Sequence, residues 1–326
     1  MKYLKIVALL FLLPLSTSFA SDIEDEIKRH AETGNVNISM AAIHLRTGEV
    51  INVGGDQVLP LASTYKIPMA ALALHMVEEG HLKHDTMIDV EPRDYVLWSP
   101  INDTFHHPGI SLSLLNVMEA MMIHSDNTAT DVLFRTIGGE EHLSHFLEEK
   151  GIKNLSVNRN TADLIRDYMG MERPPHPNIS FREQYLEMIA GTSVEEEVDE
   201  QMMYDGLLKD PRDQGSAIAM ATLLKKIWSG EILNPVNTEV LQGIMKRCVT
   251  GAHRLSGNLP AHALPISHKT GSVGGTINDA GVMEMPNGDN VVIVVYTSGS
   301  ATQDVSLNEK AIAEIARSVY DYFLYK

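Results

Sequence analysis

Cysteine is almost absent from this sequence, which has one, Cys248, in 326 residues. No internal disulfide can form, so the fold has to be stabilised by packing. We expect Cys248 itself to be a small buried hydrophobic residue rather than a catalytic thiol.

Positive charge is also scarce, because 26 lysines and arginines stand against 43 aspartates and glutamates. The net charge of −17 becomes −19 if a leader carrying Lys2 and Lys5 is removed. Nucleic acid and anionic membrane surfaces are therefore not expected as partners. The zinc patterns H-E-x-x-H and H-x-H-x-D are missing despite 14 histidines, so no metal or other cofactor is expected.

Long apolar runs are missing except at the amino terminus. Residues 1–20, "MKYLKIVALLFLLPLSTSFA", combine two lysines with an apolar core at 6–15 that is too short to cross a bilayer. Small residues precede Ser21, which predicts a secretory signal peptide cut after Ala20. Because Ser21 is not a cysteine, no membrane anchor is expected, and the product should be secreted, periplasmic or extracellular.

Strand-like segments lie near both ends of the remaining chain. The segments at 37–45 and 50–55 form a predicted hairpin. Three more predicted strands follow late in the sequence, at 266–272, 277–285 and 290–299. With helices expected at 22–32 and 307–325, these strands predict an α/β lobe built from residues 21–61 and 214–326. Residues 62–213 predict a helical lobe. Its segment 160–213 is an extended loop, either a functional lid or a solvated surface excursion.

An almost uniformly apolar helix is predicted after Pro60, and Ser63 and Lys66 stand one turn apart near its start. At a helix N-terminus, a lysine within reach of a serine hydroxyl can activate it as a nucleophile, provided that burial lowers the lysine pKa. An isolated S-x-x-K pattern is nevertheless more often a helix cap beside a solvated lysine.

Two further motifs change that interpretation. S-D-N at 125–127 falls on a predicted turn or helix start, and K-T-G-S at 269–272 falls on a predicted strand. Three such motifs in this order, each on its expected element, are a strong signal. With these motifs the chain resembles the penicillin-recognising serine hydrolases, most closely the class A serine β-lactamases. "WSP", "TGAHRLSGNLP" and "DPRDQGSAIAMATLLKKIW" are also similar to class A segments.

The resemblance implies an α/β (α+β) fold, in which an all-helical lobe lies beside a lobe with a five-stranded antiparallel sheet. The active site would lie in the cleft between them. Ser63 would be the nucleophile, Lys66 a candidate base, and Ser125 the group that passes a proton to the leaving nitrogen. The backbone N–H groups of Ser63 and Ser272 would form the oxyanion hole. The implied substrate-binding residues are Trp98, Asn127, Arg254, Lys269, Thr270 and Ser272.

One departure concerns deacylation. Class A enzymes activate a water with a glutamate in a Glu-x-x-Leu-Asn loop pattern, which this sequence lacks. Counting back from the pair at 212–213 places Glu200 at that position, although Met203 and Tyr204 replace Leu-Asn, and Asp131 replaces the asparagine that pins the loop. Glu200 is therefore the predicted water-activating residue. The alternatives left open are Lys66 acting alone or one of Glu195, Glu196, Glu197 and Asp205.

The leading hypothesis is an exported, monomeric serine hydrolase that opens the amide of β-lactams through an acyl-enzyme. The missing loop pattern favours an alternative, a related peptidoglycan peptidase or esterase with weak or no β-lactamase turnover. A non-catalytic binder or sensor that kept the scaffold is a third hypothesis, although all three motifs are intact.

Overall fold

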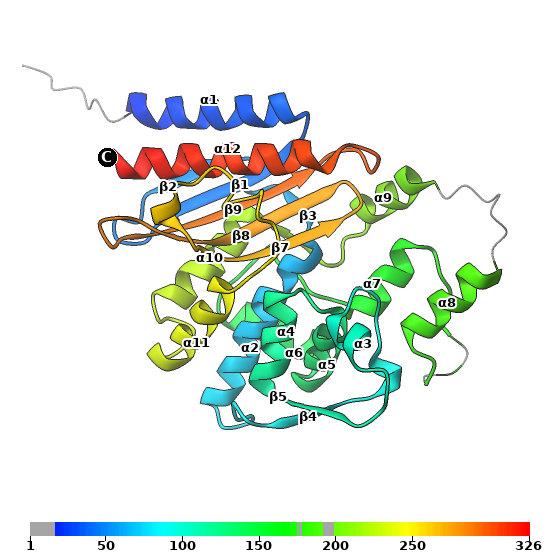
Figure 1. Cartoon of the computed structure of the whole chain (residues 1–326). Coiled ribbons are helices and arrows are strands. Elements are labelled where there is room, and N and C mark those ends of the chain that lie inside the picture. The colour runs from blue at the N-terminus through cyan, green and yellow to red at the C-terminus, as the bar shows by residue number, and fades with distance from the viewer. Residues whose placement is uncertain (1–16, 175, 177, 192–198) are drawn as a thin grey trace, which may run out of the picture.

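The computed structural model describes residues 17–174, 176, 178–191 and 199–326 (Figure 1). Most of the predicted signal peptide lies outside these residues, and the predicted cut after Ala20 falls within the first helix, α1 (Thr17–Gly34). In these ranges no helix combines the length and the apolar character needed to cross a bilayer.

A five-stranded antiparallel sheet forms one half of the molecule, with strand order β2-β1-β9-β8-β7. The predicted fold class, with strands drawn from both ends of the chain, is confirmed. The strands are β1 (Asn37–His44), β2 (Val50–Val53), β7 (Ser267–Val273), β8 (Thr276–Glu284) and β9 (Asn290–Ser298). β7 is an edge strand, which leaves one row of its backbone groups available to a neighbour.

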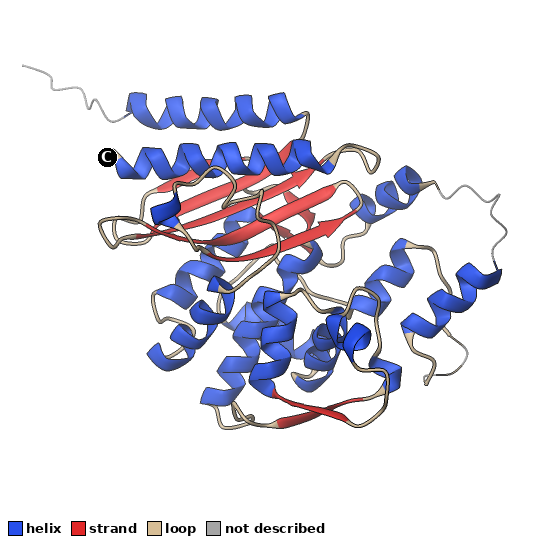
Figure 2. Cartoon of the chain, viewed as in Figure 1, coloured by secondary structure: helices blue, strands red, loops and turns tan. Residues whose placement is uncertain are grey.

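Helices cover both faces of this sheet (Figure 2), which explains why β9 is apolar from Val291 to Tyr296. Val291, Ile293 and Val295 share a hydrophobic core with the first helix and the last, α12 (Val305–Leu324). Val292 and Val294 point to the opposite face, where α10 (Ala217–Trp228) packs on β1 and β9. Alternate residues of one strand therefore belong to two hydrophobic cores.

The larger of these cores continues from the sheet into the helical part of the molecule. Its central element is α2 (Lys66–Glu78), which is buried on all sides over its first nine residues and is apolar all round for that reason. The surrounding helices are α3 (Pro100–Thr104), α4 (Leu114–Ile123), α5 (Asn127–Thr136), α6 (Gly139–Glu149) and α11 (Pro235–Lys246). Because one core spans sheet and helices, the division into lobes at 61/62 and 213/214 stays a prediction.

Short elements connect these parts. β3 (Val58–Pro60) pairs with β6 (Gln214–Ser216), and β4 (Met87–Val90) pairs with β5 (Ile110–Ser113). The 3₁₀ turns are η1 (Ala62–Tyr65), η2 (Pro92–Asp94) and η3 (Ala261–Ala263).

The segment expected as an extended loop carries three helices, α7 (Thr161–Tyr168), α8 (Phe181–Gly191) and α9 (Glu200–Lys209). α8 begins with a capping box, since Ser180 Oγ accepts from the Glu183 amide and Glu183 Oε2 accepts from the Ser180 amide. α9 is attached to the sheet by the buried Tyr204, whose hydroxyl lies 3.0 Å from Thr276 Oγ1 and 2.9 Å from Ser298 Oγ. The segment is therefore largely helical and is docked on the body of the protein through α9.

Candidate active site

Ser63 lies in the 3₁₀ turn η1, and the α-helix proper starts three residues later at Lys66. Its neighbour Ala62 has a left-handed φ of 46°, a conformation that needs support from the surroundings. That support comes from Asn278, whose Nδ2 donates to Pro60 O (2.9 Å) and Leu61 O (3.1 Å). Held in this way, Ser63 faces a cavity of about 390 Å³.

Lys66 is fully buried, yet its ammonium does not pair with Ser63 as expected. Lys66 Nζ donates to the carbonyl of Ser125 (2.8 Å), to Asn127 Oδ1 (2.9 Å) and to Ser125 Oγ (3.2 Å). Among the described residues the Ser63 hydroxyl has no hydrogen-bond partner. Burial lowers the pKa of Lys66 well below its usual value, and the charge of Lys269 lowers it further. Lys66 is thus suited to be a neutral base.

The Ser125 hydroxyl joins the three motifs. Lys269 Nζ donates to Ser125 Oγ at 3.0 Å, and Lys66 Nζ donates to the same oxygen. Ser125 has a left-handed φ of 59°, which marks a constrained backbone at this point. Burial lowers the pKa of Lys269 to about 8. One hydroxyl between two amines is a route along which a proton can move.

The edge strand β7 packs directly on η1 because residue 271 is a glycine. A Cβ at Gly271 would lie 2.8 Å from Leu61 O and 2.9 Å from the Ser63 nitrogen, closer than real Cβ contacts. The backbone of β7 therefore lies beside the Ser63 N–H, and Ser272 lines the same cavity as Ser63.

Arg254, predicted to bind substrate, is itself buried and occupied by protein acceptors. Its Nη1 donates to the carbonyls of Gly271 (3.1 Å) and Asn278 (3.0 Å), and its Nε donates to Glu309 (3.1 Å). Its Nη2 donates to Ser272 Oγ at 2.7 Å. Arg254 therefore holds the end of β7 in place and presents the Ser272 hydroxyl.

Trp98 and Asn127 both line the cavity on the helical side. Asn127 Nδ2 donates to the carbonyl of Leu97 (2.9 Å), which ties the tryptophan segment to α5. The buried Asp126 accepts from Ser99 Oγ (2.7 Å) and so fixes the same segment. Trp98 is 63% exposed with a φ of 55°, so its ring stands at the mouth of the cavity rather than in a core.

The predicted water-activating residue, Glu200, does not lie in this cavity. Glu200 is exposed at the start of α9, and Asp205 is exposed on the same helix, while Glu195, Glu196 and Glu197 lie outside the described residues. Thr161, at the start of α7, lines the cavity, and its hydroxyl lies 2.6 Å from the Tyr65 hydroxyl. Among the described residues that line the cavity, none is a carboxylate.

Asp131, which stands where class A enzymes have the asparagine that pins the loop, holds the start of α7. Its carboxylate accepts from the amides of Thr161 (2.6 Å) and Ala162 (2.9 Å). Burial raises the pKa of Asp131 to about 6, although these amide donors act in the opposite direction. The same contacts hold Thr161 at the cavity wall.

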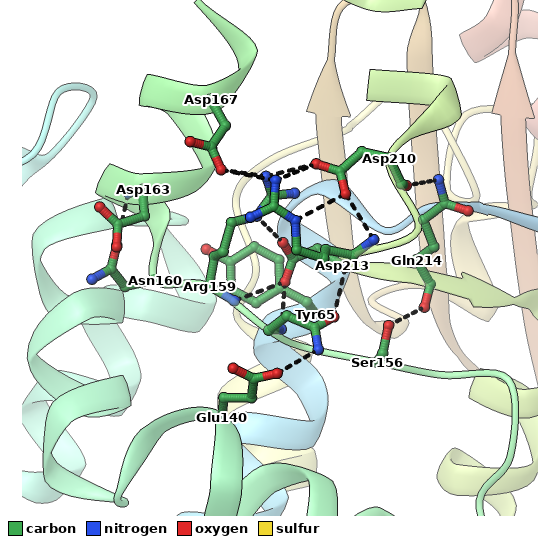
Figure 3. A network of polar contacts seen from close by, with 12 residues as sticks. Tyr65, Glu140, Ser156, Arg159, Asn160, Asp163, Asp167, Asp210, Asp213 and Gln214 are labelled. Carbon is green, nitrogen blue, oxygen red and sulfur yellow. Dashed lines mark hydrogen bonds and ion pairs between the residues drawn. The ribbon is translucent and has the colours of Figure 1, made fainter. Parts of the chain in front are cut away.

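Counting back from Asp213 failed because the segment between its two anchors is expanded. Arg159 and Asp213 form a buried ion pair, with Nε 2.6 Å from Oδ2, at the two ends of this segment (Figure 3). Arg159 Nη1 also reaches Asp167 (2.8 Å) and Asp210 (2.9 Å). Thr161 follows Arg159 by two residues and therefore lies beside the first anchor of the segment, which sequence reasoning did not identify.

Thr270 connects the cleft to a polar cluster behind it. Its hydroxyl lies 2.6 Å from Thr250 Oγ1, which lies 3.2 Å from Cys248 Sγ. Cys248 was expected to be a small buried hydrophobic residue, but it is only partly buried, and its Sγ contacts the polar Thr250. In the part of the chain that the structure describes, no group of three or more His, Cys, Asp or Glu residues is arranged to hold a metal ion.

Comparisons with known proteins agree with this architecture. The model of the β-lactamase enzyme family matches residues 19–323. Beta-lactamase VEB-1 from Pseudomonas aeruginosa is 24% identical over 99% of this chain and 97% of its own length. An ancestral class A β-lactamase of Gram-negative bacteria superposes with a TM-score of 0.75 at 26% identity, covering 92% of this chain and 98% of its own. A mutant of PBP-A, solved as an acyl-enzyme complex with penicillin G, superposes with a TM-score of 0.73 at 27% identity. The match covers 96% of this chain and 100% of the PBP-A chain.

The sheet, the helical body and three motifs that meet at one serine define a serine hydrolase of the penicillin-recognising class. With nearly the whole sequence matched, the chain belongs to the β-lactamase enzyme family, in its class A serine branch.

Proposed function

We propose that this protein is a serine hydrolase that opens the amide of β-lactams by forming an acyl-enzyme at Ser63. The observation that carries the proposal is the convergence of Lys66 and Lys269 on Ser125 Oγ, beside the free hydroxyl of Ser63. Relatives named as β-lactamases over nearly the whole chain support the substrate class.

In the proposed acylation, neutral Lys66 takes the proton of Ser63 as its oxygen attacks the carbonyl carbon. Ser125 then delivers a proton to the departing nitrogen and is resupplied from Lys66, with which it is hydrogen-bonded. The positive charge of Lys269 favours the developing anion. The backbone N–H groups of Ser63 and Ser272 form the oxyanion hole, which contributes about 3 kcal/mol per donor in favourable cases.

Substrate binding uses the remaining cavity residues. Asn127 binds the side-chain amide of the substrate, Thr270 and Ser272 bind its carboxylate, and Trp98 forms the outer wall. Arg254 acts through Ser272 in this proposal, because its guanidinium is already satisfied. Glu200 has no role in it, since it lies outside the cavity. Export by a signal peptide, a monomeric state and the two-lobe division belong to the same proposal.

A second candidate function is favoured by the cavity wall at Thr161, where none of the described lining residues is a carboxylate that could activate a water. An enzyme of this kind acylates readily and releases the acyl group slowly. That behaviour fits a peptidase acting on peptidoglycan-like peptides, or an esterase, with weak β-lactamase turnover. The two candidates share the acylation chemistry and differ only in deacylation.

The test compares wild type with Ser63→Ala, using a chromogenic cephalosporin and intact-mass measurement after exposure to a penicillin. Turnover that needs Ser63 and leaves no adduct supports the β-lactamase. A long-lived penicilloyl adduct together with cleavage of a D-Ala-D-Ala peptide supports the peptidase. Finding neither turnover nor adduct with the wild-type protein contradicts both candidates and favours a non-catalytic binder.

A further inference from the structure

Asn278 on β8 is a fully buried side chain whose partners leave no choice in its orientation. Its Oδ1 accepts from the backbone amide of Thr297 (3.1 Å), and its Nδ2 donates to the carbonyls of Pro60 (2.9 Å) and Leu61 (3.1 Å). A backbone amide can only donate and a carbonyl can only accept, so the site needs one acceptor and two donors on one short side chain. Asparagine supplies both, whereas aspartate and leucine, which have a similar shape, do not.

The two carbonyls belong to the turn that carries the nucleophile. Ala62, with its left-handed φ of 46°, follows Leu61, and Ser63 comes next. Such a conformation persists in a residue other than glycine only where the surroundings hold it. Leu61 O also accepts from Thr64 Oγ1 (2.7 Å), but that contact lies within the turn itself. The contacts from Asn278 tie the turn, and with it the Ser63 N–H, to the sheet.

The backbone of Asn278 holds the second proposed oxyanion donor. β8 lies inside the sheet between β7 and β9, and Asn278 is paired with Gly271 on β7. Arg254 Nη1 donates to the carbonyls of both residues, at 3.0 Å and 3.1 Å, and its Nη2 donates to Ser272 Oγ at 2.7 Å. One residue of an interior strand therefore holds the turn before Ser63 through its side chain and the end of β7 through its carbonyl.

The two proposed donors are close-packed against each other. A Cβ at Gly271 would lie 2.8 Å from Leu61 O and 2.9 Å from the Ser63 nitrogen, so the turn and β7 are already in contact. Any relaxation of the turn changes the distance between the N–H groups of Ser63 and Ser272. An oxyanion hole stabilises the transition state only when both donors lie about 3 Å from the oxyanion, so a small displacement costs rate.

We propose that Asn278 is a positioning residue for acylation, which sets the separation of the two oxyanion-hole donors without touching the substrate. The inference rests on the proposed function, in which the backbone N–H groups of Ser63 and Ser272 bind the oxyanion. Loss of the Asn278 amide lets the turn relax, while the groups proposed to bind the substrate keep their contacts. The rate of acylation should therefore fall, and binding of the substrate before the reaction should change little.

Asn278→Leu removes the polar atoms and keeps the approximate shape of the side chain. Stopped-flow acylation by a fluorescent penicillin, measured over a range of its concentration, separates the dissociation constant of the first complex from the acylation rate constant. We expect the rate constant to fall about 100-fold, as for a displaced oxyanion donor. The dissociation constant should change by less than about threefold.

Asn237 on α11 provides the matched control. It is 2% exposed, and its Nδ2 donates to the carbonyl of Leu74 (3.3 Å) and to Glu78 Oε1 (2.9 Å). None of these three residues lines the cavity. Asn237→Leu removes a comparable set of buried hydrogen bonds, so it should lower the melting temperature similarly and leave acylation within about twofold of wild type. Equal losses of acylation in the two variants, or a loss confined to the dissociation constant, overturn the proposal.

Phenylboronic acid tests the two donors without a β-lactam. The Ser63 oxygen adds to boron, the serine proton is released to solvent, and the tetrahedral anion presents a boron-bound oxygen to the donors. Its dissociation constant should rise in Asn278→Leu by a factor similar to the loss of acylation rate, and an unchanged affinity overturns the proposal. If wild type binds the boronic acid but is not acylated by penicillin, the proposed function fails, whereas this comparison still decides the role of Asn278. If wild type shows neither reaction, both fail.

Asn278→Asp decides the matter if circular dichroism shows that the leucine variant is not folded. The aspartate keeps an acceptor for the Thr297 amide, and in its protonated form it also donates to one of the two carbonyls. Its acylation rate relative to wild type should therefore rise at least about threefold as the pH falls from about 8 to about 5. A ratio that is the same across this range overturns the positioning role.

Discussion

The cavity in front of Ser63 has two walls of different character. Behind the wall formed by η1, α5 and β7 lie two fully buried amines, Lys66 and Lys269, and both donate hydrogen bonds to Ser125 Oγ. The wall formed by α7 presents Thr161, Leu164 and Ile165 and no carboxylate among its described residues. In the proposed mechanism the first wall supplies the groups for acylation, whereas the described residues of the second wall supply no carboxylate for hydrolysis of the acyl-enzyme. We therefore expect substitutions in the two walls to affect acylation and deacylation separately.

The walls also differ in how they are attached. η1 and β7 are joined to the sheet and to the apolar core through Asn278 and Gly271. The expanded segment that contains α7 is fixed at its ends by the Arg159 ion pairs and the Asp131 carboxylate, and Leu164, Ile165 and Phe181 pack into the main core. Because its two ends are held together, the chain between them can change in length at a small cost in loop-closure entropy.

The largest effect should be the loss of acylation rate when Lys66, the proposed base, is replaced. Lys66→Met keeps the volume of the buried chain but cannot accept a proton, so acylation by a fluorescent penicillin should fall by about 10³-fold. Single-turnover rates measure this loss, with the exposed lysine variant Lys83→Met as the control. A loss of less than about tenfold would show that Lys66 is not the base.

The anchor of the second wall can be tested by stability. Arg159→Met leaves the buried Asp213 without its charge partner and should lower the free energy of unfolding by about 3–5 kcal/mol. Arg173, which binds Asp163 and Asp167 from a position 49% exposed, is the matched control, and Arg173→Met should cost less than about 1 kcal/mol. Urea denaturation measures both values. Similar losses in the two variants would contradict the anchoring role.

A carboxylate can be introduced by substitution at the cavity wall formed by α7. Thr161→Glu places a carboxylate at the cavity-facing start of α7, where the helix N-terminus favours its ionised form. If water activation limits turnover, release of the penicilloyl group should accelerate about 100-fold. Thr161→Gln has the same shape without a proton acceptor, so equal acceleration by both variants would exclude base catalysis as the cause.

The smallest expected effect is a pH dependence of acylation. The pKa of Lys269 is lowered to about 8 by burial, so its charge is present below pH 8 and is lost above it. The acylation rate should therefore fall about tenfold between its maximum and pH 9. Lys269→Arg keeps its charge over this range, so a falling limb that persists in this variant would assign it to another group.

Most of the first wall could be predicted from the sequence. S-x-x-K, S-D-N and K-T-G-S are short local patterns, and each fell on the expected kind of element. The second wall could not be predicted by counting residues, because α8 and α9 lengthen the segment between Arg159 and Asp213. Glu200 was chosen for its distance from Asp213 along the chain, and that distance is not preserved when a segment expands between fixed ends.

The sequence by itself determined the strand and helix pattern, the three motifs and the family that they identify, because these depend on local periodicity and short spacing. Only the tertiary structure decided that Lys66 is directed to Ser125 rather than to Ser63, that Arg254 is occupied by protein acceptors, and that Thr161 lines the cavity. Each of these results depends on side chains brought together from distant parts of the chain, where burial and neighbouring charges set both orientation and pKa.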